Sequence, residues 1–538
     1  MIAVTAEHDV IVVGSGGAGL VAACAAADRG ARVLVLEVAD HLGGTTALSG
    51  GQMWLPDTNQ MRRAGYDDSR RDARTYLDRV TLGATPTAEL DAFLDHAPRL
   101  ADYLEDDLGI ALCPVPRPDY HPGWDGARFG RSLEPAPVST TELGPLRDRL
   151  LTSPTRPPLT ATELRTGVPP DVLRARRAAD VRTQGSGLVA GLVRACLRRG
   201  VELRTGVRVV GLAHVPTGRA VTVQDRDGDR TALAAAASVI VACGGFAHNA
   251  SMRRDLLPPL DALPLSVPTC IGDGIILGLA AGGRIRGAGE AWWTPATRLP
   301  AEAGRPVARN IVRELALPGS ILVNRDGRRF ADEASSYNDL GKAFLRFDTD
   351  DHTFPDSTAW LVFDAEFAAS RTVAGAAPGD PRPAGLVTAS DLEALADRLH
   401  VDSATLATTV ATINAAAGSG VDREFGRGSN PHDRYNGDPD HRPNPCLGRL
   451  ETPPFHALPI SLGLNGTKTG LVTSTDGAVL DPHGQPLPGL FACGESAAAL
   501  MGPGYAGNGA ALGPGLSTAL VAGAAAVGRP ASTAHPRA

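Results

Sequence analysis

A glycine-rich turn near the start of the chain has the spacing of a phosphate-binding site. The segment "HDVIVVGSGGAGLVAACAAADRG" carries Gly14, Gly16 and Gly19. Glycines at this spacing allow a tight turn, the close approach of a pyrophosphate and close packing of the following helix. The N-terminus of that helix carries partial positive charge and stabilises the phosphate. The turn therefore favours the binding of a dinucleotide.

The elements around this turn are those that a dinucleotide site requires. A short β-branched strand precedes the glycines, an alanine-rich helix runs to about Gly30, and a second strand over residues 32–36 ends on Glu37. An acid at this place accepts a hydrogen bond from a ribose hydroxyl. The glycine spacing alone is weak, since any tight strand-to-helix turn produces it. The complete βαβ unit with its acid predicts dinucleotide binding.

A second cluster of small residues indicates which dinucleotide is bound. Shortly after Glu37 the chain reads "HLGGTTALSGG", a run of glycines and hydroxyl side chains that an NAD domain does not need. The ribityl chain and ring of a flavin extend past the pyrophosphate and would contact such residues. The pattern therefore favours a flavin dinucleotide.

The alternation of strands and helices is interrupted and later resumes. It runs from residue 185 to about 275, becomes irregular, and returns at "GAVLDPHGQPLPGLFACGESAAAL", where a strand again ends on glycine and an acid. Such alternation is typical of a doubly wound α/β fold. We predict one dinucleotide-binding domain from residues 1–275 and 456–538, with a catalytic domain of residues 276–455 inserted between them. The alternative is two unrelated domains in series, which leaves the final strand without partners.

The amino-acid composition argues against several classes of function. The 538 residues carry 52 Lys and Arg against 59 Asp and Glu, a net charge of −7, and no long basic run, so we expect no nucleic-acid partner. The seven cysteines are scattered and the histidines lack metal-ligand spacing, so we expect free thiols and no metal ion. The N-terminus lacks a signal peptide and no apolar run is long enough to span a bilayer. We expect a cytoplasmic protein without a transmembrane segment, one that can lie peripherally on a membrane.

Taken together, these segments resemble the flavoproteins of the fumarate reductase and 3-ketosteroid 1-dehydrogenase superfamily. "GSGGAG…LEVADHLGGTTALSGGQMW", "IVACGGF", "GDGI", "RDGRRFADE" and "GLFACGESAAAL" stand in the family's order over nearly the whole chain. The resemblance implies an α/β, two-domain, FAD-dependent flavoprotein: a Rossmann-like FAD-binding domain interrupted by an inserted α+β catalytic domain that caps the substrate. The loop "GGTTALSGG" itself contains no histidine, where covalently flavinylated members place one, so the resemblance implies non-covalent FAD.

The same resemblance implies a set of cofactor contacts. They fall in the motifs just quoted and in the segment before the C-terminal helix. The residues that it assigns to FAD are Gly14, Gly16, Gly17, Ala18, Gly19, Glu37, Val38, Gly43, Gly44, Thr45, Thr46, Ser49, Gly50, Gly51, Val209, Ala242, Gly244, Gly245, Asp273, Gly494, Glu495, Gly509, Leu512 and Gly513.

Three of the seven tyrosines fall in stretches that resemble ketosteroid dehydrogenase motifs. Tyr120 lies in "RPDYHPGWDGARFGRSLEP", Tyr337 in "RDGRRFADEASSY" and Tyr505 in "GPGYAGNGAALGPG". The resemblance implies that Tyr337 removes a proton beside a ketone and that Tyr120 donates a hydrogen bond to its oxygen. It implies also that the Tyr505 hydroxyl and the Gly509 N–H form an oxyanion hole for the carbonyl oxygen.

The chemistry that the resemblance implies is the 1,2-dehydrogenation of a 3-ketosteroid or a similar cyclic ketone, with hydride transfer to FAD. Trp292 and Trp293 in "EAWWTPA" replace the His-Pro-Thr segment of fumarate reductases and suit a large apolar substrate. Two alternatives stay open: an enoate or fumarate-type reductase, and a desaturase of a non-steroid cyclic ketone. A third, a non-catalytic electron-transfer subunit, would leave the tyrosines without a role. We expect a quinone as electron acceptor, since no nicotinamide site is evident.

Four positions depart from the family pattern. The proline that usually follows the last tyrosine is Ala506, and Asn508 replaces a small residue between the two oxyanion donors. Asp332 stands where the family has asparagine, and His121 where a second aromatic residue is common. None of these changes removes a catalytic group. Asn508 could add a polar contact to the substrate, so the departures bear on substrate identity.

Overall fold

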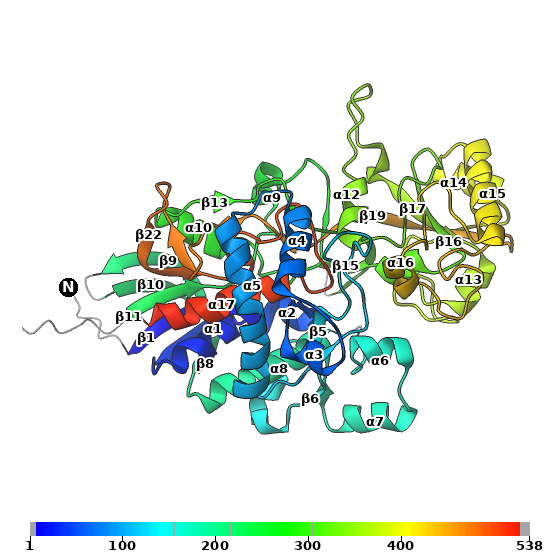
Figure 1. Cartoon of the computed structure of the whole chain (residues 1–538). Coiled ribbons are helices and arrows are strands. Elements are labelled where there is room, and N and C mark those ends of the chain that lie inside the picture. Colours follow the sequence, from blue (N-terminus) through cyan, green and yellow to red (C-terminus); the bar gives the residue numbers. More distant parts are fainter. Residues whose placement is uncertain (1–6, 154–155, 216–217, 303–304, 528–538) are drawn as a thin grey trace, which may run out of the picture.

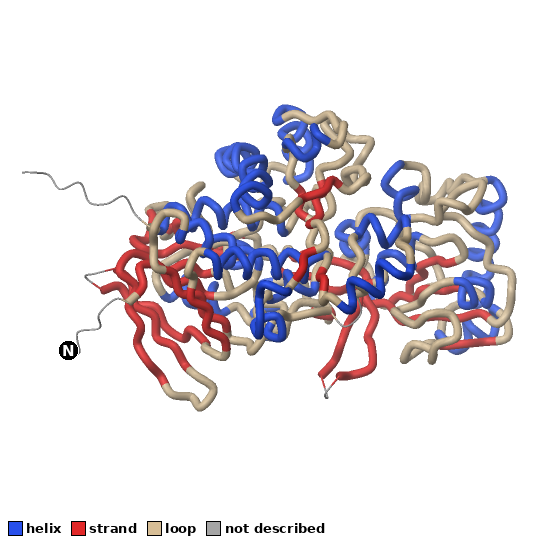
Figure 2. The backbone as a smooth tube through the Cα atoms, turned by 90° about the horizontal axis from the view of Figure 1, so that it is seen from below, coloured by secondary structure: helices blue, strands red, loops and turns tan. Residues whose placement is uncertain are grey.

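The computed structural model describes residues 7–153, 156–215, 218–302 and 305–527. Two large β-sheets lie toward opposite ends of the molecule, with helices between and beside them (Figures 1 and 2). Loops and helix ends that these layers bring together form the candidate functional site.

The first sheet has eight strands, and its parallel part follows the order β8-β2-β1-β11-β22. Counted along the chain this is the order 3-2-1-4-5 of a doubly wound dinucleotide fold. Its strands are β1 (His8–Val13), β2 (Val33–Glu37), β8 (Glu202–Thr205), β9 (Arg208–Val215), β10 (Gly218–Gln224), β11 (Arg230–Val241), β21 (Ala478–Leu480) and β22 (Pro486–Ala492). A hairpin joins β10 to β11, and its turn contains Gly228 at φ 91°.

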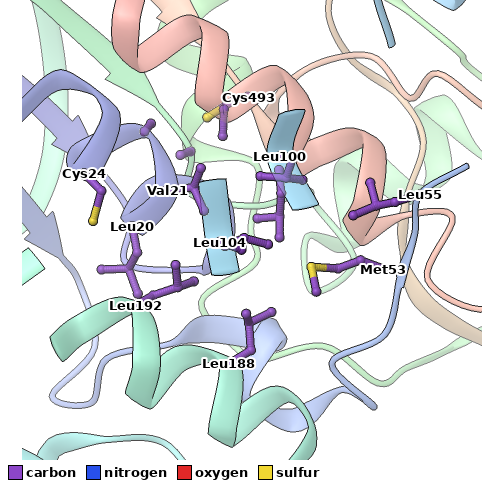
Figure 3. Close-up of a cluster of buried hydrophobic side chains, with 14 of the residues drawn as sticks. Leu20, Val21, Cys24, Met53, Leu55, Leu100, Leu104, Leu188, Leu192 and Cys493 are labelled. Carbon is purple, nitrogen blue, oxygen red and sulfur yellow. The ribbon is translucent and has the colours of Figure 1, made fainter. Parts of the chain in front are cut away.

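Helices cover both faces of this sheet because its parallel strands are apolar on both sides. Val10 and Val12 of β1 share one core cluster with helices α1 (Gly17–Ala27), α8 (Gln184–Arg198) and α17 (Leu512–Ala526). Figure 3 shows side chains of α1 and α8 pointing toward one another in this cluster. Ile11 and Val13 face the other side, toward helix α10 (Asp273–Ala280).

The C-terminal helix α17 lies directly against α1. A Cβ atom on Gly523 would come within 2.2 Å of the Ala22 carbonyl oxygen, so only glycine permits this approach. The small apolar residues at the end of the chain therefore belong to a buried helix packed against α1. Within the part of the chain that the structure describes, no helix combines the length and hydropathy needed to cross a membrane.

The second sheet has seven strands and follows the order β15-β14-β19-β17-β16, with two short strands added to β19. Its strands are β12 (Leu263–Pro264), β14 (Ala291–Glu302), β15 (Arg305–Asn310), β16 (Ser320–Asn324), β17 (Ala359–Phe363), β18 (Val387–Ala389) and β19 (Phe455–Thr467). The accompanying helices are α11 (Val312–Ala316), α12 (Tyr337–Ala343), α13 (Ala365–Ser370), α14 (Leu392–Leu399), α15 (Ser403–Ser419) and α16 (Pro431–Asn436).

A third region, largely helical, interrupts the first sheet between β2 and β8. It contains a three-stranded sheet in the order β3-β5-β4 and a two-stranded sheet of β6 and β7. Its elements are α2 (Gly44–Leu48), β3 (Met53–Trp54), α3 (Asn59–Arg63), α4 (Arg70–Thr81), α5 (Thr87–Asp102), β4 (Leu112–Pro114), β5 (Ser132–Pro135), β6 (Val138–Ser139), α6 (Ala161–Thr166), α7 (Pro170–Ala178) and β7 (Val181–Arg182). Short elements elsewhere are α9 (Ala250–Leu256), β13 (Ile285–Arg286) and β20 (Gly470–Leu471).

The predicted α/β class is confirmed, and the strand pairing refines where the inserted part ends. Strand β19 pairs with β14 and β17 along its length, so it belongs to the second sheet. The predicted boundary at residue 455 falls just before this strand. By strand pairing, the chain returns to the first sheet only after Thr467, because β21 and β22 are the next strands to join it.

Candidate active site

Three tyrosines from three separate parts of the fold meet in one cluster. Tyr120 lies in the loop between β4 and β5, Tyr337 is the first residue of α12, and Tyr505 precedes α17. Their ring centroids are 5.7 Å apart for Tyr120–Tyr337, 5.5 Å for Tyr120–Tyr505 and 5.3 Å for Tyr337–Tyr505. Tyr120 and Tyr505 are each only 4% exposed. The structure therefore brings together the three side chains that the sequence singled out.

Buried ion pairs hold the loops that deliver two of these tyrosines. Next to Tyr120, the Asp119 carboxylate accepts from Trp54 Nε1 and Arg131 Nη1, both at 2.7 Å. Before Tyr337, in the motif "RDGRRFADE", Arg329 donates to Glu333 at 2.7 and 2.8 Å. These charges are buried and paired, so removing one partner would leave the other unpaired at high cost.

Backbone contacts fix the third tyrosine loop. The Ala506 carbonyl accepts from the Tyr76 hydroxyl at 2.7 Å and from the Tyr120 N–H at 3.1 Å. Lys468 Nζ donates to the carbonyls of Pro503 at 3.2 Å and Gly504 at 2.8 Å. Burial lowers the pKa of this lysine to about 7.

Burial raises the pKa of all three phenols well above the usual value of 10. Hydrogen bonds modify this effect in opposite senses. For Tyr337, the bond with Tyr505 lowers the pKa and the bond with Tyr120 raises it. A bond that lowers the pKa of a phenol is one that the phenolate accepts. The Tyr337 hydroxyl therefore interacts with both of the other phenols.

The hydroxyl of Tyr120 does not donate to Tyr337, which corrects the expected direction. It donates to Oδ1 of Asn508, whose Nδ2 donates to Gln52 Oε1 at 2.6 Å. The amide that replaces a small residue of the family is thus held by two neighbours, and its contacts are with protein groups. Sequence reasoning marked Asn508 as a departure but could not assign these partners, which lie 388 and 456 positions away in the chain.

The two expected oxyanion donors also lie together. Gly509 has φ +89°, and a Cβ there would come within 2.4 Å of the Gln52 carbonyl oxygen, so the turn requires glycine. The backbone N–H groups of Ala511 and Gly509 hydrogen-bond to the Tyr505 hydroxyl and act to lower its pKa, against the larger effect of burial. The Tyr505 hydroxyl and the Gly509 N–H therefore lie side by side, and their joint oxyanion role stays a prediction.

Only one of the two tryptophans faces the tyrosines. Trp292 packs against Tyr505, with ring centroids 5.2 Å apart, and Lys468 Nζ lies 4.5 Å from the Trp292 ring centroid. Trp293 belongs to the core cluster of the second sheet, where Gly341 of α12 approaches its Cβ. Neighbouring residues of a strand point to opposite faces, so the pair cannot clamp one substrate.

The residues assigned to FAD gather at the carboxyl ends of four parallel strands. Gly14 to Gly19 follow β1, Glu37 and Val38 end β2, Ala242 to Gly245 follow β11, and Gly494 and Glu495 follow β22. This edge is where ligands bind in a doubly wound sheet. A Cβ on Gly14 would lie 2.5 Å from the Ala242 carbonyl oxygen, and one on Gly19 would lie 2.0 Å from the Gly14 carbonyl oxygen.

The remaining assigned residues flank this edge, with two exceptions. Gly43 to Thr46 begin α2, with Ser49 to Gly51 beyond it, and Thr46 Oγ1 accepts from the Gly17 N–H at 3.0 Å. Gly509, Leu512 and Gly513 lie at the start of α17. Val209 is buried in the core, so only its backbone is available, and the Asp273 carboxylate is bound by Arg208 at 2.7 and 2.8 Å. The cofactor roles of these residues stay predictions.

A cavity of about 70 Å³ lies beside the residues that follow β22. It is lined by residues that include Trp292, Glu495, Ala511 and Pro514. Burial raises the pKa of the Glu495 carboxyl to about 7. Among the described residues no cation lies within ion-pair distance of this acid. The pocket thus offers a carboxyl group suited to the hydroxyls of a ligand.

Other site residues were not predicted. The ring of His432 in α16 lies 4.7 Å from that of Tyr120, and burial lowers its pKa well below 6.5. Its neighbour Asp433 lies against Asp332, and burial together with this acid raises the pKa of Asp332 to about 8. The segment that carries α16 has no periodic pattern, so the sequence offered no signal for either contact. Asp332 was visible only as a departure from the family.

Comparison with known proteins shows which family and fold the chain shares. A family profile described as "FAD binding domain" matches residues 9–512. The chain is 36% identical to 4-oxocyclohexanecarboxylate 2-dehydrogenase of Sinomonas cyclohexanicum, over 97% of this chain and 93% of that protein. It is 33% identical to 3-oxosteroid 1-dehydrogenase of Mycobacterium tuberculosis, over 96% and 97%. The crystal structure of 3-ketosteroid delta1-dehydrogenase from Sterolibacterium denitrificans with 1,4-androstadiene-3,17-dione superposes with a TM-score of 0.89, at 33% identity over 97% and 99%.

The paired acids predict a pH-dependent stability. In the folded protein Asp332 keeps its proton up to a pKa of about 8, against 3.8 for an ordinary aspartate. The folded state therefore binds the extra proton in this window, and the free energy of unfolding falls as pH rises through it. Asp332→Asn removes this titration. We expect its melting temperature to equal that of the wild type at about pH 4 and to exceed it at about pH 8 to 9.

The matched control is Asp326→Asn, because Asp326 is an exposed turn residue in the same segment. Thermal unfolding of the three proteins over this pH range gives the comparison. An Asp332→Asn variant with the same pH slope as the wild type would show that Asp332 is ionised in the folded state.

Proposed function

Because this chain belongs to the FAD-binding-domain family of flavoproteins and shares nearly its full length with 3-oxosteroid 1-dehydrogenases, we propose that it desaturates a cyclic ketone. The reaction is the 1,2-dehydrogenation of a 3-ketosteroid or a similar ring. The observation that carries the proposal is the cluster of three tyrosines, with ring centroids 5.3 to 5.7 Å apart. Trp292 packs against Tyr505 and also lines the pocket beside the end of β22. The named relatives share this reaction type on rings that carry a ketone.

The residues present fit FAD as the cofactor. The glycine turn after β1 leaves room for a pyrophosphate, and the N-cap residues of α1 and α17 make no side-chain cap. At α1 the Gly17 N–H is bonded by Thr46 Oγ1, and the partial positive charge of both helix ends favours negative charge on a ligand. Glu495 supplies a carboxyl group within the pocket for hydroxyl groups of the cofactor. When bound, FAD accepts the hydride that leaves the substrate. The attachment is non-covalent, as the loop "GGTTALSGG" predicts.

In the proposed mechanism, Tyr337 removes a proton from the carbon next to the carbonyl group. That proton becomes removable only when the carbonyl oxygen is stabilised as it gains negative charge. The Tyr505 hydroxyl and the Gly509 N–H donate to this oxygen, in a site that excludes water. On substrate binding the Tyr505 proton turns from Tyr337 to the ketone. The electron pair of the broken C–H bond then forms the double bond as the hydride leaves the neighbouring carbon.

The wall of the site that would contact the substrate is apolar and has few polar groups. Trp292 stacks edge-on against Tyr505 and provides one wall. This wall suits a hydrocarbon ring and does not supply the charged clamp of a dicarboxylate. We propose a steroid-like ketone as substrate and a quinone as the acceptor that reoxidises FAD. Enoate or fumarate reduction remains the alternative that the same experiment decides.

The direct test is to add candidate substrates to the FAD-loaded protein in the absence of oxygen and to measure whether the flavin is reduced. We expect a 3-ketosteroid or 4-oxocyclohexanecarboxylate to reduce the bound flavin, recorded as loss of its visible absorbance. The two ketones together separate a steroid substrate from a small ring. If neither ketone bleaches the protein while fumarate reoxidises its chemically reduced form, the chain is a reductase and the proposal is wrong.

The oxyanion role gives a second prediction. Tyr505→Phe removes one of two donors to the developing charge, and we expect turnover with saturating ketone to fall about a hundredfold. The control is Tyr103→Phe, because the Tyr103 hydroxyl donates to Asp28 far from the cluster. A Tyr505→Phe enzyme with normal turnover and only a raised KM would place Tyr505 in substrate binding.

A further inference from the structure

Asn508 receives the only proton of the Tyr120 hydroxyl. Its Oδ1 accepts from Tyr120, and its Nδ2 donates to Gln52 Oε1 at 2.6 Å. The NH2 of Asn508 faces the Gln52 oxygen, which can only accept. The Asn508 carbonyl faces the Tyr120 hydroxyl. The amide therefore bridges these two side chains.

The surroundings hold Asn508 in this position. Its main-chain carbonyl accepts from Ser132 Oγ at 2.9 Å, and the next residue, Gly509, accepts from the Trp54 N–H at 3.1 Å. Gln52 is 7% exposed. The amide cannot turn away from Tyr120 without breaking bonds in a nearly dry site, where an unpaired polar group is costly.

From this arrangement we infer that Asn508 is a positioning residue that sets the direction of the hydrogen bonds in the tyrosine cluster. A side-chain carbonyl can accept but cannot donate, so the Tyr120 proton is committed to Asn508. The Tyr120 oxygen then offers only lone pairs to its other neighbours. The Tyr120 proton therefore does not serve Tyr337, although the ring centroids of the two tyrosines lie only 5.7 Å apart.

This direction has a consequence for the base. A phenolate at Tyr337 is stabilised by each hydroxyl that donates to it. While Asn508 holds the Tyr120 proton, Tyr120 cannot donate to Tyr337, and the ionised form of Tyr337 has one donor fewer. Asn508 thus keeps Tyr337 protonated to a higher pH than a small residue at this position would. The inference rests on the proposed function only in giving Tyr337 the role of base.

Other titratable and charged groups also face this pair, and their effect does not depend on Asn508. Arg117 acts to lower the pKa of both Tyr120 and Tyr337. Burial and the neighbouring phenols act in the opposite sense and have the larger effect. Asp339 of α12 raises the pKa of Tyr120 and lies 3.2 Å from His121 Nε2. Tyr505 and His432 of α16 also pack against this pair. A variant at position 508 leaves all of these in place.

The test is Asn508→Leu, which keeps the approximate volume and removes the acceptor. The freed Tyr120 hydroxyl should donate to Tyr337, so that Tyr337 ionises at a pH lower by roughly one unit. The acid limb of the pH profile of kcat/KM with the reducing ketone should move down by the same amount. Asn508→Ala, with a smaller side chain, should move it in the same direction.

A second readout does not require turnover. The ultraviolet absorbance change of tyrosinate is followed with pH in the FAD-loaded protein, with Tyr337→Phe subtracted in each background to isolate Tyr337. If the enzyme desaturates no ketone, the proposed function fails while this titration still tests Asn508. We expect the Tyr337 step at lower pH in Asn508→Leu than in the wild type.

Ser132→Ala is the matched control, because it removes a hydrogen bond to the main chain of Asn508 and leaves the side chain intact. We expect its Tyr337 step to stay at the wild-type pH. The inference is overturned if Asn508→Leu leaves that step unchanged or raises it. An equal shift in Ser132→Ala would also overturn it, because the effect would then come from the loop and not from the amide.

Discussion

Three phenol groups buried in contact with one another are the constraint on which the rest of this structure depends. A buried hydroxyl needs a partner, and here each tyrosine supplies the partner of the next. The series ends on the amide of Asn508, which Gln52 in turn orients. Because the members come from three parts of the fold, the cluster exists only when the first sheet, the second sheet and the helical region are assembled. Formation of the tyrosine cluster therefore depends on the folding of all three regions.

The same burial that assembles the site opposes its chemistry. Removal from water raises the pKa of Tyr337, the group that must become a base. The charge of Arg117 acts in the opposite sense, as does the Tyr505 hydroxyl until it turns to the ketone, but burial has the larger effect. The dry environment has a compensating benefit, since donors aimed at a developing oxyanion are worth more there than in water. Burial thus makes Tyr337 harder to ionise, and it also strengthens the stabilisation of negative charge on the ketone oxygen.

Local patterns predicted the framework, and long-range contacts decided the details. The βαβ unit, the glycine turn and the resumed strand near Gly494 are readable because each depends on a few neighbouring residues. The assignment of β19 to the second sheet could not be predicted, because the sequence of one strand does not indicate which strands it pairs with. The opposite orientation of Trp292 and Trp293 follows from strand alternation and was available from sequence. The partners of Asn508 and the pairing of Asp332 with Asp433 depend on segments far apart in the chain, one of them without periodicity.

The most direct test of the central claim separates proton removal from hydride transfer. With FAD reduced in advance, no hydride can leave the substrate, so exchange of the hydrogen next to the carbonyl with deuterium from solvent reports the base alone. The account predicts that the wild-type protein catalyses this exchange, followed by mass spectrometry of the recovered ketone, and that Tyr337→Phe does not. Exchange at the wild-type rate in Tyr337→Phe would contradict it.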